Sequence, residues 1–164
     1  MLILGVDVST FFVDYVLIPD EGNHAPVWHR FPLTGADAWE RARSVAQAVP
    51  GPDSAIYEDV LAIGVENPQA SGPAAQNIAL LHRVVGAVLT RLPVATLVQP
   101  WQPPEWRKRA GLPGNASKAQ VSEHGIIVAQ DMGADWTMRD HPQDCFDALV
   151  IALATRDAIR TDTP

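Results

Sequence analysis

A chain of 164 residues, 47% hydrophobic and 19% charged, has the length and composition of one globular domain with a sizeable core. The formal net charge of −7 argues against a polyanionic partner, and the single cysteine, Cys145, excludes both an intramolecular disulfide and a zinc site built from thiolates. No apolar run reaches the ~18 residues of a membrane span, and residues 1–7 lack the basic start of a signal peptide, so we expect a cytoplasmic protein with no membrane partner.

The first part of the chain predicts three consecutive strands, a helix and a buried strand. Apolar runs over residues 2–8, 11–18 and 27–31 are typical of short strands, and their close spacing predicts a meander. Residues 36–48 carry apolar side chains at helical spacing. Residues 60–65 are almost entirely apolar, which indicates a central strand that is buried on both faces.

The second part of the chain alternates helices with one strand. Residues 74–92 form the longest stretch with helical spacing, and residues 94–98 predict a short strand. A proline-rich connection follows over residues 99–104. Residues 118–129 and 143–159 predict the last two helices.

This order of elements predicts an α/β fold with a mixed five-stranded sheet and helices on both of its faces. We find no internal repeat and no linker, so we expect residues 1–164 to form a single domain. The order resembles that of the RNase H-like fold, although a fold alone does not give a function.

Four acidic residues stand in apolar surroundings, where carboxylates are rare unless something pairs with them. Asp7 lies within the first predicted strand, Glu66 ends the fourth, and Asp144 and Asp147 open the last helix. Residues three apart on a helix have Cβ atoms about 5–6 Å from each other, so the last two carboxylates would repel unless a cation lies between them.

These acids suit metal-assisted hydrolysis of a phosphodiester. Mg²⁺ prefers hard oxygen ligands, and two such ions activate the attacking water and stabilise the leaving oxygen. The sequence contains no histidine–cysteine cluster and no glycine-rich phosphate loop that would indicate another chemistry. Taken singly, each acid also has a structural interpretation, as a hydrogen-bonded strand residue, an exposed strand end or a helix-dipole partner.

Basic residues gather in one segment, which weakens the argument from net charge. Between Trp101 and Gln130, two acidic residues stand against four basic ones, Arg107, Lys108, Arg109 and Lys118. The three consecutive basic residues fit either a solvated helix face or a phosphate contact beside a Trp106 ring that stacks on a base. The overall charge stays negative even with two divalent ions bound, so DNA remains a possible substrate rather than an evident one.

The motifs together resemble the RuvC-type Holliday-junction resolvases over roughly residues 2–158. The resemblance rests on Gly-Val-Asp7, on Glu66 at the end of a strand, on the segment 115–121 with Lys118, and on the late motif Asp144-x-x-Asp147-Ala-Leu-x-Ile-Ala. It implies that the four acids are catalytic metal ligands for two Mg²⁺ ions, with Mn²⁺ as a substitute. It also implies that Lys118 contacts a DNA phosphate and that a homodimer cuts branched DNA.

Some residues depart from this pattern or leave alternatives open. The stretch Asn67-Pro-Gln-Ala70 lacks the aromatic residue that RuvC proteins commonly carry there. We expect His141 to cap the last helix rather than to assist a metal, and Trp101 to be packed. The alternative functions are another RNase H-like nuclease of the YqgF type, which acts in RNA processing, and a non-catalytic nucleic-acid-binding module of the same fold.

Overall fold

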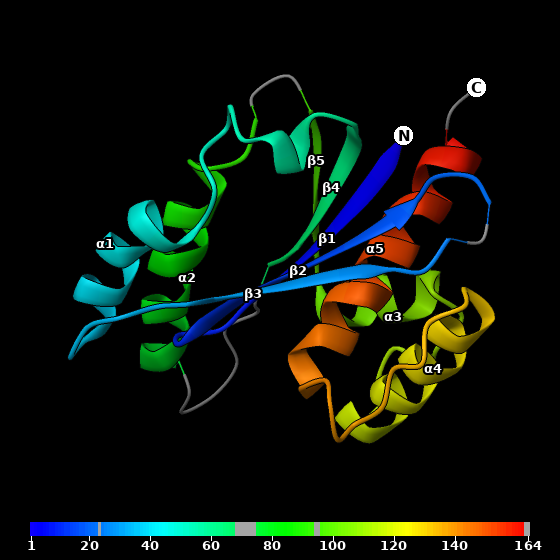
Figure 1. The fold of residues 1–164 in the computed structure, drawn as a ribbon. Helices are drawn as coiled ribbons and strands as arrows, with labels where there is room; N and C mark the ends of the chain where they lie inside the picture. Colours follow the sequence, from blue (N-terminus) through cyan, green and yellow to red (C-terminus); the bar gives the residue numbers. More distant parts are fainter. Residues whose placement is uncertain (23, 68–74, 94–95, 163–164) are drawn as a thin grey trace.

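Five strands form one mixed sheet in the order β3-β2-β1-β4-β5 (Figure 1). The computed structural model describes residues 1–22, 24–67, 75–93 and 96–162. Strands β1, β2 and β3 are antiparallel neighbours, whereas β4 runs parallel to both β1 and β5. The predicted mixed five-stranded α/β sheet is therefore confirmed, with strands β1 (Leu2–Val8), β2 (Phe12–Pro19), β3 (Val27–Pro32), β4 (Val60–Glu66) and β5 (Leu97–Trp101).

Helices cover both faces of the sheet, as the element order predicts (Figure 1). One core lies between the sheet and the pair α1 and α2, and another lies between the sheet and α5. Helices α3 and α4 pack against α5. The described helices are α1 (Ala38–Ala48), η1 (Ala55–Tyr57), α2 (Ala75–Leu89), α3 (Pro103–Arg109), α4 (Lys118–Asp131) and α5 (Gln143–Asp162).

Alternation along β1 explains how one strand serves both cores. Leu4 and Val6 point into the core below α1 and α2, whereas Ile3 belongs to the core below α5. Because successive side chains of a strand alternate between the two faces, Asp7 lies on the α5 face with Ile3. The strand pattern therefore places the first predicted acid toward the last helix.

Two glycines bring α5 close to the middle of the sheet. Gly5 on β1 is the register partner of Gly64 on β4. A Cβ atom at Gly5 would overlap the carbonyl oxygen of Ala148, and one at Gly64 would overlap the hydroxyl of Thr155. The helix therefore lies directly over the β1–β4 pair, and its first turns lie near the carboxyl ends of these strands.

The structure departs from the sequence prediction around the fifth strand. The predicted strand at residues 94–98 overlaps β5 (Leu97–Trp101) at residues 97 and 98, and β5 continues into the segment 99–104 that was expected to be a connection; residues 94 and 95 lie outside the described residues. A proline is tolerated there because β5 is an edge strand, with β4 as its one neighbour among the described strands. Helix α3 was not predicted; it begins with prolines, and Glu105 accepts a hydrogen bond from the backbone N–H of Gln102 across its first turn.

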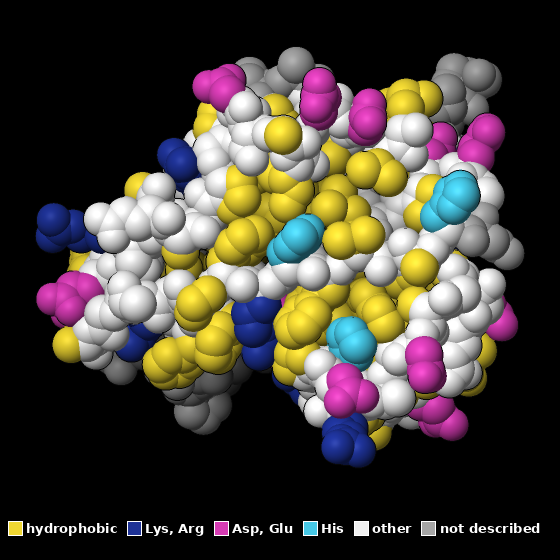
Figure 2. Space-filling model, viewed as in Figure 1, with side chains coloured by type: hydrophobic (Ala, Val, Ile, Leu, Met, Phe, Trp, Pro, Cys, Tyr) yellow, Lys and Arg dark blue, Asp and Glu magenta, His cyan; other side chains and the backbone are white. Residues whose placement is uncertain are grey.

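The surface seen from the side of β3 is more apolar at its middle than at its margins. In Figure 2, hydrophobic side chains gather over the strands, and most acidic and basic side chains lie toward the periphery.

Within the described part of the chain, no helix is both long and apolar enough to cross a bilayer.

Candidate metal and nucleic-acid site

A row of polar residues crosses the sheet on its α5 face. The strand registers pair Arg30 on β3 with Asp14 on β2, and Asp14 with Asp7 on β1. Glu66 on β4 lies one residue beyond the last β1–β4 register pair and is itself the partner of Trp101 on β5. Asp7 and Glu66 thus stand side by side at the carboxyl ends of β1 and β4, a usual location for sites in α/β proteins, and Asp14 lies next to Asp7 near the start of β2.

Helix α5 adds two more carboxylates to this row. Asp144 and Asp147 lie in its first turns, and oxygen atoms of Asp7, Asp144 and Asp147 all lie within 4.8 Å of one another. A cleft of about 310 Å³ is lined by these three residues together with Glu66. The structure therefore brings all four predicted acids into one cleft.

Burial and mutual repulsion disfavour the charged forms of these acids. Asp7 is 9% exposed and Asp147 is 7% exposed. Burial, followed by the charges of Glu66 and the two α5 acids, raises the pKa of Asp7 well above its usual range. Burial and the charge of Glu66 raise the pKa of Asp147 to about 7, and burial raises the pKa of Glu66 as well. The charges of Lys118 and Arg107 lower the pKa of Asp147 and Glu66, but burial outweighs them.

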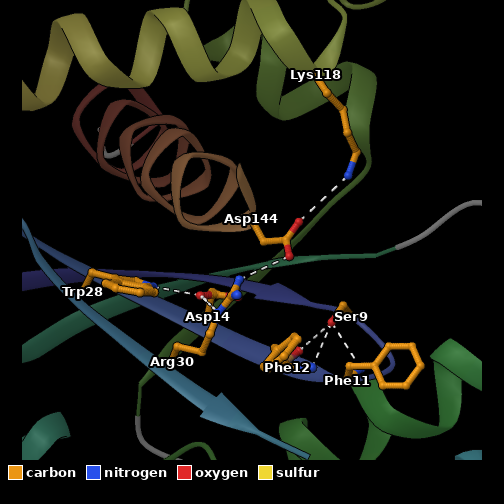
Figure 3. A network of polar contacts seen from close by, with 8 residues as sticks. All are labelled: Ser9, Phe11, Phe12, Asp14, Trp28, Arg30, Lys118 and Asp144. Atoms are coloured by element: carbon orange, nitrogen blue, oxygen red, sulfur yellow. Dashed lines mark hydrogen bonds and ion pairs between the residues drawn. The ribbon is translucent and has the colours of Figure 1, made fainter. Parts of the chain in front are cut away.

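Neighbouring donors hold two of the acids in place. Asp144 lies between two cations, 3.3 Å from Nη2 of Arg30 and 3.9 Å from Nζ of Lys118 (Figure 3). Glu66 accepts a 3.1 Å hydrogen bond from the indole N–H of Trp106 on α3. That bond favours the charged form and lowers the pKa of Glu66, against the larger effect of burial.

The predicted basic residues divide into two groups. Arg107 and Lys118 line the same cleft as the acids. Arg109 instead pairs with Asp157 on α5, with Nε 2.7 Å from the carboxylate. The side chain of Lys108 lies against Gly114. The cleft therefore combines four acids with two basic side chains, and the other two basic residues lie outside its lining.

The aromatic residues of this region are mostly structural. Trp106 is fully buried, so its ring is not available to stack on a base, which was one of the two sequence interpretations. Trp101 is packed as predicted, and its indole donates a 2.9 Å hydrogen bond to Thr155. The ring of His141 stacks on Trp136 with centroids 4.7 Å apart. Of the stretch 67–70, only Asn67 lies within the described residues.

Sequence reasoning missed Asp14, Arg30 and the role of the Trp106 indole. Asp14 occupies an inward-facing position of β2 on the same face as Val16, and it pairs with Asp7 across the hairpin. The alternation of inward- and outward-facing residues along β2 could have identified Asp14 as an inward-facing acid opposite another buried acid. The Trp106 contact was not accessible in this way, because it depends on a helix that the sequence did not predict.

The donor set suits a divalent cation. All four acids offer carboxylate oxygens, the ligands that hard ions such as Mg²⁺ and Mn²⁺ prefer. One oxygen of Asp147, Oδ1, is buried and has no hydrogen-bond partner among the described residues. Buried carboxylate oxygens are normally satisfied, so a cation in the cleft accounts both for this atom and for the repulsion among the acids.

Two solved structures of a protein from Thermus thermophilus share this fold. The Thermus thermophilus RuvC structure has a TM-score of 0.68 and 21% identity, and the match covers 99% of this chain and 98% of that one. T. thermophilus RuvC in complex with a Holliday junction substrate has a TM-score of 0.70 and 18% identity, with 98% and 95% covered. No family model and no curated protein matches the sequence. At these identities the likeness shows the fold, and it confirms the predicted RNase H-like architecture.

Proposed function

We propose that residues 1–164 form a single nuclease domain, a metal-dependent endodeoxyribonuclease that cleaves branched DNA such as Holliday junctions. The observation that carries the proposal is the convergence of Asp7, Asp144 and Asp147 within 4.8 Å, in a cleft that also holds Glu66. A structure with the same fold was solved with a Holliday junction substrate, which supports the choice of substrate class.

The four acids are proposed to hold two Mg²⁺ ions, which Mn²⁺ can replace. Bound there, the ions would activate a water for attack on the phosphodiester and stabilise the leaving oxygen. Asp147 must give up the proton that its raised pKa favours near neutral pH before both of its oxygens can act as ligands. Metal binding should therefore weaken as the pH falls below about 7.

Basic residues at the cleft are proposed to bind the DNA backbone. Lys118 is 66% exposed and pairs with Asp144 only at 3.9 Å, so its ammonium group is free to move to a phosphate. Arg107 lines the same cleft. Lys108 and Arg109 follow on the same helix and extend the predicted DNA-binding surface, although Asp157 already offsets the charge of Arg109. Phosphate contacts of this kind position DNA without reading its sequence.

The protein is proposed to act as a homodimer. A four-way junction has two-fold symmetry, so resolving it requires two symmetric nicks, and two copies of one active site supply them. A monomeric variant should then nick forks weakly but lose paired cleavage of a four-way junction.

A cleavage assay with matched variants tests the proposal. The wild-type protein, with Mg²⁺, is compared on a four-way junction, a fork, a linear duplex and RNA. Asp7→Asn removes a ligand with little change in volume, so cleavage should fall to background while DNA binding persists. Asp53→Asn removes the same charge from an exposed residue beside η1, before β4 begins, and should cleave like the wild type.

Each alternative function gives a different result in this assay. Cleavage by Asp7→Asn at a near wild-type rate would refute the assignment of the acids. Equal rates on junction and linear duplex would refute the junction preference and leave a general nuclease. Cleavage of RNA alone would favour the YqgF-type function, and binding without cleavage in Mg²⁺ or Mn²⁺ would favour the non-catalytic module.

A further inference from the structure

We infer that Asp14 and Arg30 are positioning residues that hold Asp144 in the orientation in which it serves the metal site. The inference rests on the proposed function, since it concerns how the same acids are arranged. It adds two residues from β2 and β3 that belong neither to the four acids nor to the basic side chains of the cleft (Figure 3).

Asp14 is buried and fully engaged. It is 1% exposed, and its Oδ1 accepts hydrogen bonds from Nε1 of Trp28 at 2.7 Å and from Nε of Arg30 at 2.9 Å. Its Oδ2 accepts a further bond from Nη2 of Arg30 at 2.9 Å. With both oxygens occupied, Asp14 is an anchor for Arg30 rather than a fifth metal ligand, although it stands directly opposite Asp7.

Arg30 is consequently held in one orientation. Its guanidinium group forms a two-armed contact with Asp14, a geometry that a planar fork allows and a lysine does not. It also lies over the ring of Phe12, 4.4 Å from the centroid. The same Nη2 that bonds Asp14 lies 3.3 Å from Oδ2 of Asp144. A fixed donor from the sheet therefore reaches one oxygen of a proposed ligand on α5.

The function of this contact is to orient rather than to add charge. The positive charge of Arg30 is offset by Asp14, so the pair as a whole changes the potential at the cleft little. What it provides is a fixed hydrogen bond to Oδ2 of Asp144, which leaves Oδ1 on the side of the cleft where Lys118 lies. Hydrogen bonds to metal-ligating carboxylates are worth about 10–100-fold in metal affinity.

Charge and orientation can be separated by substitution. Replacing Arg30 alone removes a positive charge near the acids, which by electrostatics should tighten cation binding. Replacing both residues, as Asp14→Asn with Arg30→Gln, exchanges one neutral pair for another and removes only the fixed geometry. We expect this double variant to bind Mn²⁺ about tenfold or more weakly than the wild type.

The experiment is a calorimetric titration of the full chain with MnCl₂ in the absence of DNA. The matched control is Asp20→Asn with Arg160→Gln, which removes another acid–arginine pair, 3.6 Å apart, at the far end of β2. The control should bind Mn²⁺ like the wild type. In an Asp144→Asn background, the Asp14/Arg30 double variant should cause no further loss, because its effect passes through Asp144.

The possible outcomes separate failure of this inference from failure of the proposed function. Unchanged Mn²⁺ affinity in the double variant, or an equal further loss in the Asp144→Asn background, would overturn the inference. If the thermal melt in chelator shows that the double variant does not fold, Arg30→Lys replaces it. This variant keeps the positive charge and one bond to Asp14 but loses the two-armed contact. Wild-type Mn²⁺ affinity in Arg30→Lys would also overturn the inference. Should the wild type itself bind no Mn²⁺, or bind it no better than Asp7→Asn does, the proposed function fails instead.

Discussion

Asp147→Asn should stabilise the metal-free protein at neutral and alkaline pH. Asp147 is 7% exposed, its Oδ1 has no hydrogen-bond partner among the described residues, and its pKa is raised from 3.8 to about 7. The folded state therefore holds a proton that the unfolded state has lost between about pH 4 and pH 7, and stability falls as the pH rises through this window. Above it the penalty is fully present.

The size of this effect follows from the shift. Each pH unit of pKa difference corresponds to about 1.4 kcal/mol, so a shift of about three units gives an upper bound of roughly 4 kcal/mol. Burial causes most of this shift and the charge of Glu66 adds to it, but an asparagine at this place is still a buried polar group, so about 2–4 kcal/mol is expected in chelator at pH 8. For a chain of this length that corresponds to a rise of about 5–15 °C in melting temperature.

Thermal unfolding in EDTA across pH 5–8.5 measures the prediction. The wild type should lose stability as the pH rises, and the variant should lose markedly less. Millimolar Mg²⁺ should restore the wild type through preferential binding to the folded state, and should affect Asp147→Asn less. Asp144→Asn is the matched control, since that acid is already paired with Arg30 and Lys118 and its removal should give no comparable gain. Parallel curves for wild type and Asp147→Asn would refute the reasoning.

Three further predictions test other parts of the site. Trp106→Phe removes the N–H that favours the charged form of Glu66, so the pKa of Glu66 should rise and the affinity for Mn²⁺ should fall, most at low pH. Trp101→Phe loses a hydrogen bond to Thr155 instead, and it should bind Mn²⁺ normally in the same calorimetric titration. Lys118→Ala should weaken all DNA substrates alike and reduce the slope of log affinity against log salt by about 0.9, measured by fluorescence anisotropy; a loss confined to one substrate would contradict a phosphate contact. Gly5→Ala should destabilise the fold severely in denaturant unfolding, because its Cβ overlaps the backbone of α5; a near wild-type midpoint would show that the helix can move away.

Local patterns in the sequence were sufficient to predict most of the elements. The apolar runs of β1 and β4 and the helical spacing of α2 depend on neighbours within one element, which a single sequence shows. The acids were visible for the same reason, since a carboxylate such as Asp7 within an apolar strand is anomalous wherever that strand lies. Their convergence was predicted from the resemblance to the RuvC-type resolvases, and helical spacing alone predicted only that Asp144 and Asp147 lie close together.

What escaped prediction depends on register and on packing between distant segments. The pairing of Asp14 with Arg30 requires the alignment of two strands separated by a turn. The contact of Arg30 with Asp144 joins residues more than a hundred positions apart in the sequence. The fifth strand was placed too early because Pro100 reads as a strand breaker, whereas an edge strand has N–H groups without a sheet partner. Helix α3 starts at prolines that sequence reasoning assigned to a connection, so the Trp106 contact was lost with it.

The position of the acids and the closeness of α5 to the sheet have one cause. Side chains at Gly5 and Gly64 would displace the helix outward, and Asp147 would then move away from Asp7. The same close approach buries the acids and so makes the metal-free site unstable. The remainder of α5 must offset that instability through fully buried side chains such as Phe146. Because a bound cation relieves the repulsion only in the folded state, metal binding and folding of this helix are thermodynamically linked.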